Sequence, residues 1–300
     1  LIYFITQLKY ASTKQKTAST VYRTMNIFDR KAKALQRERA AQRDDYHLAE
    51  YIKEEVGWRT ADRIFDIKRT FKNAVELGAS RGYVSRHFIP DSVEKVTLCD
   101  TSQTHLDKAL VGDGVQFEKV VMDEENLDFP DNSVDLMVSS LMLHWVNDLP
   151  GVFDKVMRCL KPDGVSDTLI IFQYYAYFFE CIALDVDSLT VWYPTAWEVM
   201  RDVRAIGDNN AALNRPLRLN KAEQFATAAI YDEMYGKVRA FFYIPATYQI
   251  INFLGWKPDP KQPQPMTRGS GEVSLKDLHK IDEIITEKTK YRTILTNGGK

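Results

Sequence analysis

The sequence has few cysteines and almost no net charge, and each shortage excludes a class of protein. Its 300 residues include only Cys99, Cys159 and Cys181, without CxxC or other close metal-ligand spacing. Three cysteines are too few, and odd in number, to form a disulfide framework. We therefore expect the protein to reside in a reducing compartment. The 40 basic and 41 acidic residues leave a formal charge of -1, which disfavours a nucleic-acid partner held mainly by charge.

Long apolar runs are also missing. The most apolar segment, LIIFQYYAYFFECIAL at 169–184, is 16 residues long and is interrupted by Gln173 and Glu180. A transmembrane helix needs about 20 apolar residues, so this segment predicts a buried strand or a helix that covers a sheet. Any association with a membrane is therefore expected to be peripheral.

Acidic residues are absent from the first 28 positions, which hold four basic residues and seven Ser or Thr. Basic, Ser-rich, acid-poor leaders are typical of mitochondrial import signals. We expect residues 1–24 to direct the chain to the matrix, and the alternative is a disordered basic tail.

The rest of the chain divides by composition into three parts. Residues 25–70 carry alternating charges with apolar residues at three- and four-residue steps, which predicts helices whose charges form a solvated face. Residues 71–256 have the pattern of an α/β domain. Prolines open the part at 257–300, and a polar helix is expected within it at 271–290.

The segment NAVELGASRGYVSRHF predicts a strand, a turn containing Gly78 and Gly82, and a helix. Such a unit opens nucleotide-binding α/β folds. Glycines serve there because a ligand approaches the backbone too closely for a Cβ.

Acidic residues end the next two predicted strands. KVTLCD ends at Asp100, VQFEKVVM is followed by Asp123 and Glu124, and SVDLMVSSL forms a fourth strand. An acid at the tip of the second strand can accept hydrogen bonds from a ribose hydroxyl pair. The pattern therefore predicts one ligand-binding edge of a doubly wound sheet.

This order resembles the class I S-adenosylmethionine-dependent methyltransferases, whose Rossmann-like fold we therefore expect, preceded by a helical segment. A narrower similarity is to the mitochondrial complex I assembly factors of that superfamily that are described as arginine hydroxylases. It rests on MNIFDR at 25–30, YIKEEVGWRTADRIFDI at 51–67, SSLMLHWVNDLPGVF at 139–153, LKPDGV at 160–165 and IPATYQI at 244–250.

The resemblance implies a role for each acid and glycine of the edge. It places Glu76, Gly78 and Gly82 under the methionine moiety of S-adenosylmethionine, Asp100 on its ribose, Asp123 at its adenine edge, and Glu124 as a weaker candidate. Asp100 is then a ligand-binding residue whose loss should leave the stability of the apo protein almost unchanged.

Two departures from the family put cofactor binding in question. Ser80 stands where the family has its second glycine, so a Cβ and a hydroxyl face the cofactor. The segment after Gly164 is shorter than in the family, which leaves open whether the sheet closes normally.

No catalytic residue and no metal site can be named. His105 and Asp107 have the spacing of a His-x-carboxylate iron pair, but on a helix they point apart, and no third ligand is identifiable. His144 and Trp145 follow the fourth strand and should border the pocket.

The resemblance implies an enzyme that binds S-adenosylmethionine and hydroxylates an arginine of a complex I subunit. One alternative is an O-methyltransferase of the biotin-pathway type, which shares a similar stretch after the fourth strand. The other is a non-catalytic assembly chaperone that has kept the fold and lost the cofactor.

Overall fold

The computed structural model of the chain describes residues 26–168, 180–216, 218, 220–238 and 242–260. The described residues up to Asp259 belong to one compact unit. Its strands are β1 (Ala74–Leu77), β2 (Lys95–Asp100), β3 (Gln116–Val121), β4 (Val134–Ser139), β5 (Leu160–Thr168), β6 (Glu180–Tyr193), β7 (Lys237–Val238) and β8 (Phe242–Trp256).

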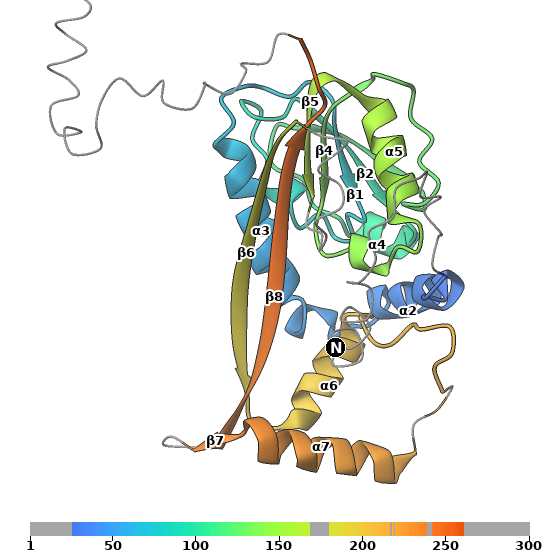
Figure 1. Cartoon of the computed structure of the whole chain (residues 1–300), viewed down its shortest axis with the longest axis vertical. Helices are drawn as coiled ribbons and strands as arrows, with labels where there is room; N and C mark the ends of the chain where they lie inside the picture. Colours follow the sequence, from blue (N-terminus) through green and yellow to red (C-terminus); the bar gives the residue numbers. More distant parts are fainter. Residues whose placement is uncertain (1–25, 169–179, 217, 219, 239–241, 261–300) are drawn as a thin grey trace, which may run out of the picture. The chain divides into compact units, whose positions relative to one another are not determined.

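The sheet has the order β3-β2-β1-β4-β5-β8-β6, and the short β7 pairs with β8 (Figure 1). Neighbours from β3 to β5 are parallel, whereas β8 runs antiparallel to both β5 and β6. The chain leaves β1 in one direction for β2 and β3 and then crosses back to β4. This reversal between β1 and β4 is the point at which doubly wound sheets bind ligands.

Helices accompany the sheet on both sides (Figure 1). They are α2 (Arg30–Ala41), α3 (Tyr51–Phe65), α4 (Gln103–Asp107), α5 (Leu149–Cys159), α6 (Ala196–Ala205) and α7 (Lys221–Tyr235), with short 3₁₀ turns at Tyr46–Leu48, Ser85–His87 and Leu143–Trp145. Two helices thus occupy the segment between residues 25 and 70, as its periodicity predicts.

Both faces of the sheet are buried, because side chains that alternate between the two faces pack against the helices. Ile64 of α3 belongs to a cluster with Val96 and Leu98 of β2. Phe153 of α5 belongs to a second cluster with Val75 of β1. Because strands buried on both faces are nearly continuous hydrophobic runs, the short apolar segments of the sequence become central strands.

The class I methyltransferase-like architecture expected from the sequence is confirmed, and the sheet closes through β5, β8 and β6. The apolar segment 169–179, the leader 1–24 and the polar helix at 271–290 lie outside the described residues. Among the described residues, no helix is long and apolar enough to span a membrane.

One local prediction is wrong. The helix expected after the glycine turn is only the 3₁₀ turn Ser85–His87, because positive φ values at Ser80 and Gly82 interrupt a helical path. The LKPDG segment lies inside β5, where the pairing with β4 shifts register and Asp163 has a φ of 61°.

Candidate active site

The loop after β1 is held in a left-handed conformation at three positions. Gly78, Ser80 and Gly82 have φ values of 65°, 52° and 69°. A Cβ on Gly78 would lie 2.3 Å from Cγ of Met142, so no larger residue fits there. Ser80 adopts a backbone conformation that favours glycine, so the departure from the family's glycine pattern costs strain of about 1 kcal/mol.

Glu76, predicted to lie under the cofactor, shapes this loop. It is buried near the end of β1, and its carboxylate oxygens accept the amides of Val84 at 3.2 Å and Ser85 at 3.0 Å. Burial raises the pKa of Glu76 to about 7, although the two amides act in the opposite direction. Glu76 thus holds the loop that follows β1 against that strand.

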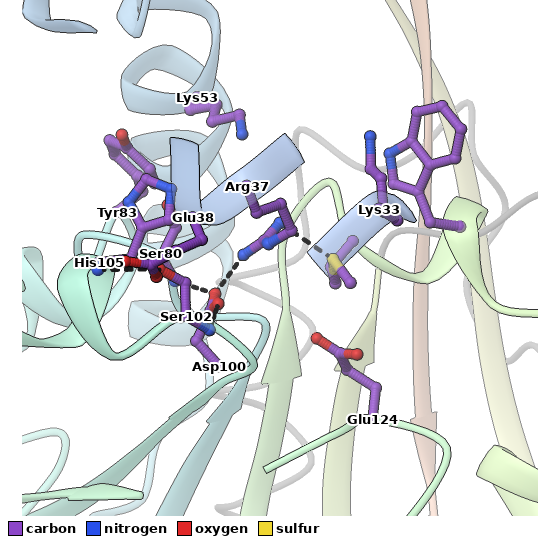
Figure 2. Close-up of polar contacts among 12 residues, drawn as sticks. Lys33, Arg37, Glu38, Lys53, Ser80, Tyr83, Asp100, Ser102, His105 and Glu124 are labelled. Carbon is purple, nitrogen blue, oxygen red and sulfur yellow. Dashed lines mark hydrogen bonds and ion pairs between the residues drawn. The ribbon is translucent and has the colours of Figure 1, made fainter. Parts of the chain in front are cut away.

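Asp100, at the end of β2, lies at the centre of the site (Figure 2). The carboxylate is fully buried and accepts the amides of Ser80 and Ser102, each at 2.8 Å. It also forms an ion pair with the guanidinium of Arg37 from α2. Asp100 therefore joins the glycine loop, the start of α4 and α2.

Asp123 and Glu124, which follow β3, hold a second guanidinium group. Nη2 of Arg30 lies 2.8 Å from Asp123 Oδ1 and 2.5 Å from Glu124 Oε2, and Nη1 donates to the carbonyl of Trp145 at 3.2 Å. Burial raises the pKa of Glu124, and Arg30 and Arg37 partly offset that rise. The structure thus brings together all the predicted site residues at one edge of the sheet.

The basic residues of α2 were not among the site residues predicted from the sequence. Arg30, Lys33 and Arg37 face the acidic edge, and Lys33 and Arg37 are buried. The prediction that the charges of this segment form a solvated face is wrong for these three. Their spacing of three and four residues places them on one side of a helix, and this was the signal available in the sequence.

Lys33 connects α2 to the loop after α6. Its ammonium group donates to the carbonyl of Gly207 at 2.8 Å and to Asp208 Oδ1 at 3.1 Å, and it lies 3.3 Å from the ring centre of Trp145. Asp208 also forms an ion pair with Lys53 of α3, at 3.1 Å. Burial lowers the pKa of Lys33 to about 7, because the attraction of Asp208 only partly offsets desolvation.

Several buried polar atoms at this edge lack hydrogen-bond partners within the described part of the chain. They are Oγ of Ser80, Oγ1 of Thr101, Oε1 of Glu124 and Oγ of Ser139 and Ser140. Buried polar groups are normally paired, so such a group indicates a ligand site. These donors and acceptors suit the ribose, adenine and amino-acid groups of S-adenosylmethionine.

The space left at this edge is small. A space too small to admit a water molecule lies among Arg30, Lys33, Ala34, Arg37, Thr101 and Met142, whereas ligand pockets usually measure about 300–1,000 Å³. Arg37 and Met142, which are in contact at 3.1 Å, fill the rest. The residues at this edge carry the chemical groups that the cofactor would need, and side chains of α2 fill the space that the cofactor would occupy.

The two weaker histidine candidates differ in position. His105 is buried, neither ring nitrogen has a partner among the described residues, and burial lowers its pKa to about 2. Asp107 is exposed at the end of the same helix. Trp145 borders the site through Lys33, and the neighbouring His144 lies within electrostatic range of Lys33 and Asp208.

Comparison with known proteins agrees with this arrangement. A methyltransferase domain model matches residues 75–166, which span β1 to β5. The "Arginine-hydroxylase NDUFAF5, mitochondrial" of Danio rerio is 36% identical over 88% of this chain and 93% of its own. That of Homo sapiens is 36% identical over 89% and 87%. A "Malonyl-[acyl-carrier protein] O-methyltransferase" of Gallionella capsiferriformans is 26% identical over 78% of this chain. The chain belongs to the family of the mitochondrial arginine-hydroxylase NDUFAF5.

Proposed function

We propose that the chain binds S-adenosylmethionine at the carboxyl edge of strands β1 to β4 and acts as a protein-arginine hydroxylase in the assembly of mitochondrial complex I. Membership of the arginine-hydroxylase family carries this proposal, since the similarity covers most of both chains. We place the protein on the matrix side of the inner membrane, with peripheral association, and its substrate in a complex I subunit.

Each predicted site residue has a task in this proposal. Gly78 and Gly82 give the loop the close approach needed by the methionine moiety, and Glu76 holds that loop in place. Asp100 accepts the ribose hydroxyls, and Asp123 contacts the adenine edge. Bound S-adenosylmethionine supplies a sulfonium cation, which a carboxylate such as Glu124 attracts.

Binding requires α2 to shift, because Arg37 already occupies Asp100. The ribose would replace the guanidinium as the partner of Asp100, and Arg30 would release Asp123 to the adenine.

The test has a binding arm and an activity arm. Calorimetry with S-adenosylmethionine compares the wild type with Asp100→Asn. Cells that lack the endogenous protein then receive either form, and mass spectrometry measures the added oxygen on arginines of complex I subunits. We expect binding and the added oxygen in the wild type and a large loss of both in Asp100→Asn. Wild-type rescue without an added oxygen contradicts the hydroxylase proposal.

A non-catalytic assembly chaperone is the second candidate. Arg37, Met142 and the Cβ of Ser80 take up space at the proposed cofactor edge, and this favours a chaperone. In that case, the wild type restores complex I assembly although it neither binds S-adenosylmethionine nor adds oxygen to an arginine. The relative named as an O-methyltransferase is less similar, so we do not pursue that activity.

A further inference from the structure

Helix α7 presents an apolar face to solvent. Phe225, Ile230 and Met234 are 63%, 55% and 64% exposed. On the same side lie the exposed alanines Ala222, Ala226 and Ala229, at steps of three and four residues, and one charged residue, Glu233. We call the six apolar residues the α7 stripe. A stripe with this spacing is the usual core-facing side of an amphipathic helix.

The α7 stripe is not needed to attach the helix to the protein. The other side of α7 carries Ala228, which is buried, and Tyr231, whose hydroxyl donates to the carbonyl of Pro245 in β8 at 2.9 Å. Asn220 and Glu223 form a capping box that fixes its N-terminus. The helix is therefore held from one side and remains apolar on the other.

The stripe continues onto the neighbouring helix. Trp197 of α6 contacts the ring of Phe225 edge-to-face, with centroids 5.1 Å apart, and is itself partly exposed. Aromatic residues are enriched at the centres of protein interfaces, where they supply large contact areas. An aromatic pair thus lies at the edge of the apolar face.

The charges of α7 select among possible occupants. The helix carries one basic residue, Lys221, and three acidic residues, Glu223, Asp232 and Glu233, hence a net charge of -2. A second copy of the same helix would bring like charges together, and an acidic helix is repelled by anionic lipids. A partner helix with basic residues beside its apolar positions is attracted both by the apolar stripe and by the negative charge of α7.

We propose that the α7 stripe docks an amphipathic helix of a partner protein whose polar flanks are basic. Docking of this kind places apolar anchors at helical spacing against the stripe, and a basic residue of the partner pairs with Glu233, which lies four residues after Ala229 on the same side of the helix. The surface adjoins the start of β8, at the opposite end of that strand from its pairing with β5 (Figure 1). It therefore operates independently of the cofactor site.

The probe is a synthetic amphipathic helix of leucine and lysine, compared with a matched helix of leucine and glutamate. Fluorescence anisotropy measures binding of each to the full chain and to the variant Phe225→Ser/Ile230→Ser/Met234→Ser. The matched control is Leu48→Ser/Ile89→Ser/Leu110→Ser, which removes equally exposed apolar residues elsewhere. A third variant, Glu223→Gln/Asp232→Asn/Glu233→Gln, removes the acidic charges.

We expect the lysine helix to bind the wild type and the control alike, and the α7 stripe variant at least tenfold more weakly. The charge variant should bind more weakly than wild type and depend less on salt. Hydrogen exchange should slow in α7 when the lysine helix binds. Equal binding to the stripe variant, or stronger binding of the glutamate helix, overturns the proposal.

Two further measurements identify the competing occupants. Concentration-dependent dimerisation that the stripe variant abolishes would assign the surface to a second copy. Binding to phosphatidylserine vesicles that the stripe variant abolishes would assign it to a membrane. Either result contradicts a protein partner with basic flanks, and neither affects the proposed cofactor site.

Discussion

Arg37 and Asp100 form a buried ion pair across the carboxyl edge of the sheet. Asp100 is the acid that the sequence pattern assigns to a ribose, and in the structure a guanidinium from α2 is its charged partner (Figure 2). Both side chains are almost completely buried. Cofactor binding and the closed position of α2 therefore compete for the same carboxylate.

Arg37→Gln should bind S-adenosylmethionine more tightly than the wild type. Removing the guanidinium frees Asp100 for the ribose, and we expect a gain of about tenfold, or 1.4 kcal/mol. Calorimetry measures it. Arg39→Gln, an exposed change on the same helix, is the control and should bind like the wild type. Weaker binding by Arg37→Gln would mean that Arg37 contacts the cofactor directly.

Asp100→Asn should lower the stability of the apo protein by about 3–5 kcal/mol, because it leaves the charge of Arg37 buried and unpaired. The buried ion pair thus argues against the expectation that Asp100 contributes little to apo stability. Urea unfolding measures the change. In the double variant Asp100→Asn/Arg37→Gln, the loss should be clearly smaller than the sum of the two single losses. Additive losses would show that the pair is not coupled.

The fold and its acidic edge could be predicted from the sequence, because apolar strands ending in acids are local patterns. The partners of those acids could not, because Arg37 lies 63 residues before Asp100 and the two meet only when α2 packs across the edge. The helix predicted after the glycine turn does not form, for a related reason. The backbone conformation at Ser80 depends on the hydrogen bond from its amide to the carboxylate of Asp100, which joins the loop after β1 to the end of β2.

Ser80→Gly should leave stability nearly unchanged and tighten cofactor binding. Relief of about 1 kcal/mol of strain is offset by the larger entropy of glycine in the unfolded chain, about 0.4–1 kcal/mol. The unpartnered hydroxyl and the Cβ no longer face the ligand. Urea unfolding and calorimetry measure the two effects.

Asn132→Gly is the matched control for Ser80→Gly, since Asn132 has a φ of 54° in an exposed turn. It should change stability little and cofactor affinity not at all. Equal affinity of the wild type and Ser80→Gly would show that the loop does not approach the ligand at this position.

Glu76 should make the protein less stable as the pH rises. Its pKa is about 7 when folded against an ordinary value of 4.5, so between these values the folded state holds a proton that the unfolded state has lost. This contribution is lost over that window, by about 3 kcal/mol in total. Urea unfolding at several pH values should show a smaller loss in Glu76→Gln. Parallel curves for both proteins would rule out Glu76 as the source.

Gly57→Ala should destabilise the contact between α3 and the glycine loop. A Cβ there would lie 2.4 Å from the carbonyl oxygen of Tyr83, and overpacking of this kind costs about 1–3 kcal/mol, partly offset by about 1 kcal/mol of helix propensity. Tyr83 donates to Glu50 at 2.5 Å, so its displacement should also disturb the loop and weaken cofactor binding. Urea unfolding and calorimetry test both effects. Asp62→Ala, an exposed change on the same helix, is the control and should affect neither stability nor cofactor binding. If Gly57→Ala gained stability, α3 and the loop would pack less closely than the distance to Tyr83 indicates.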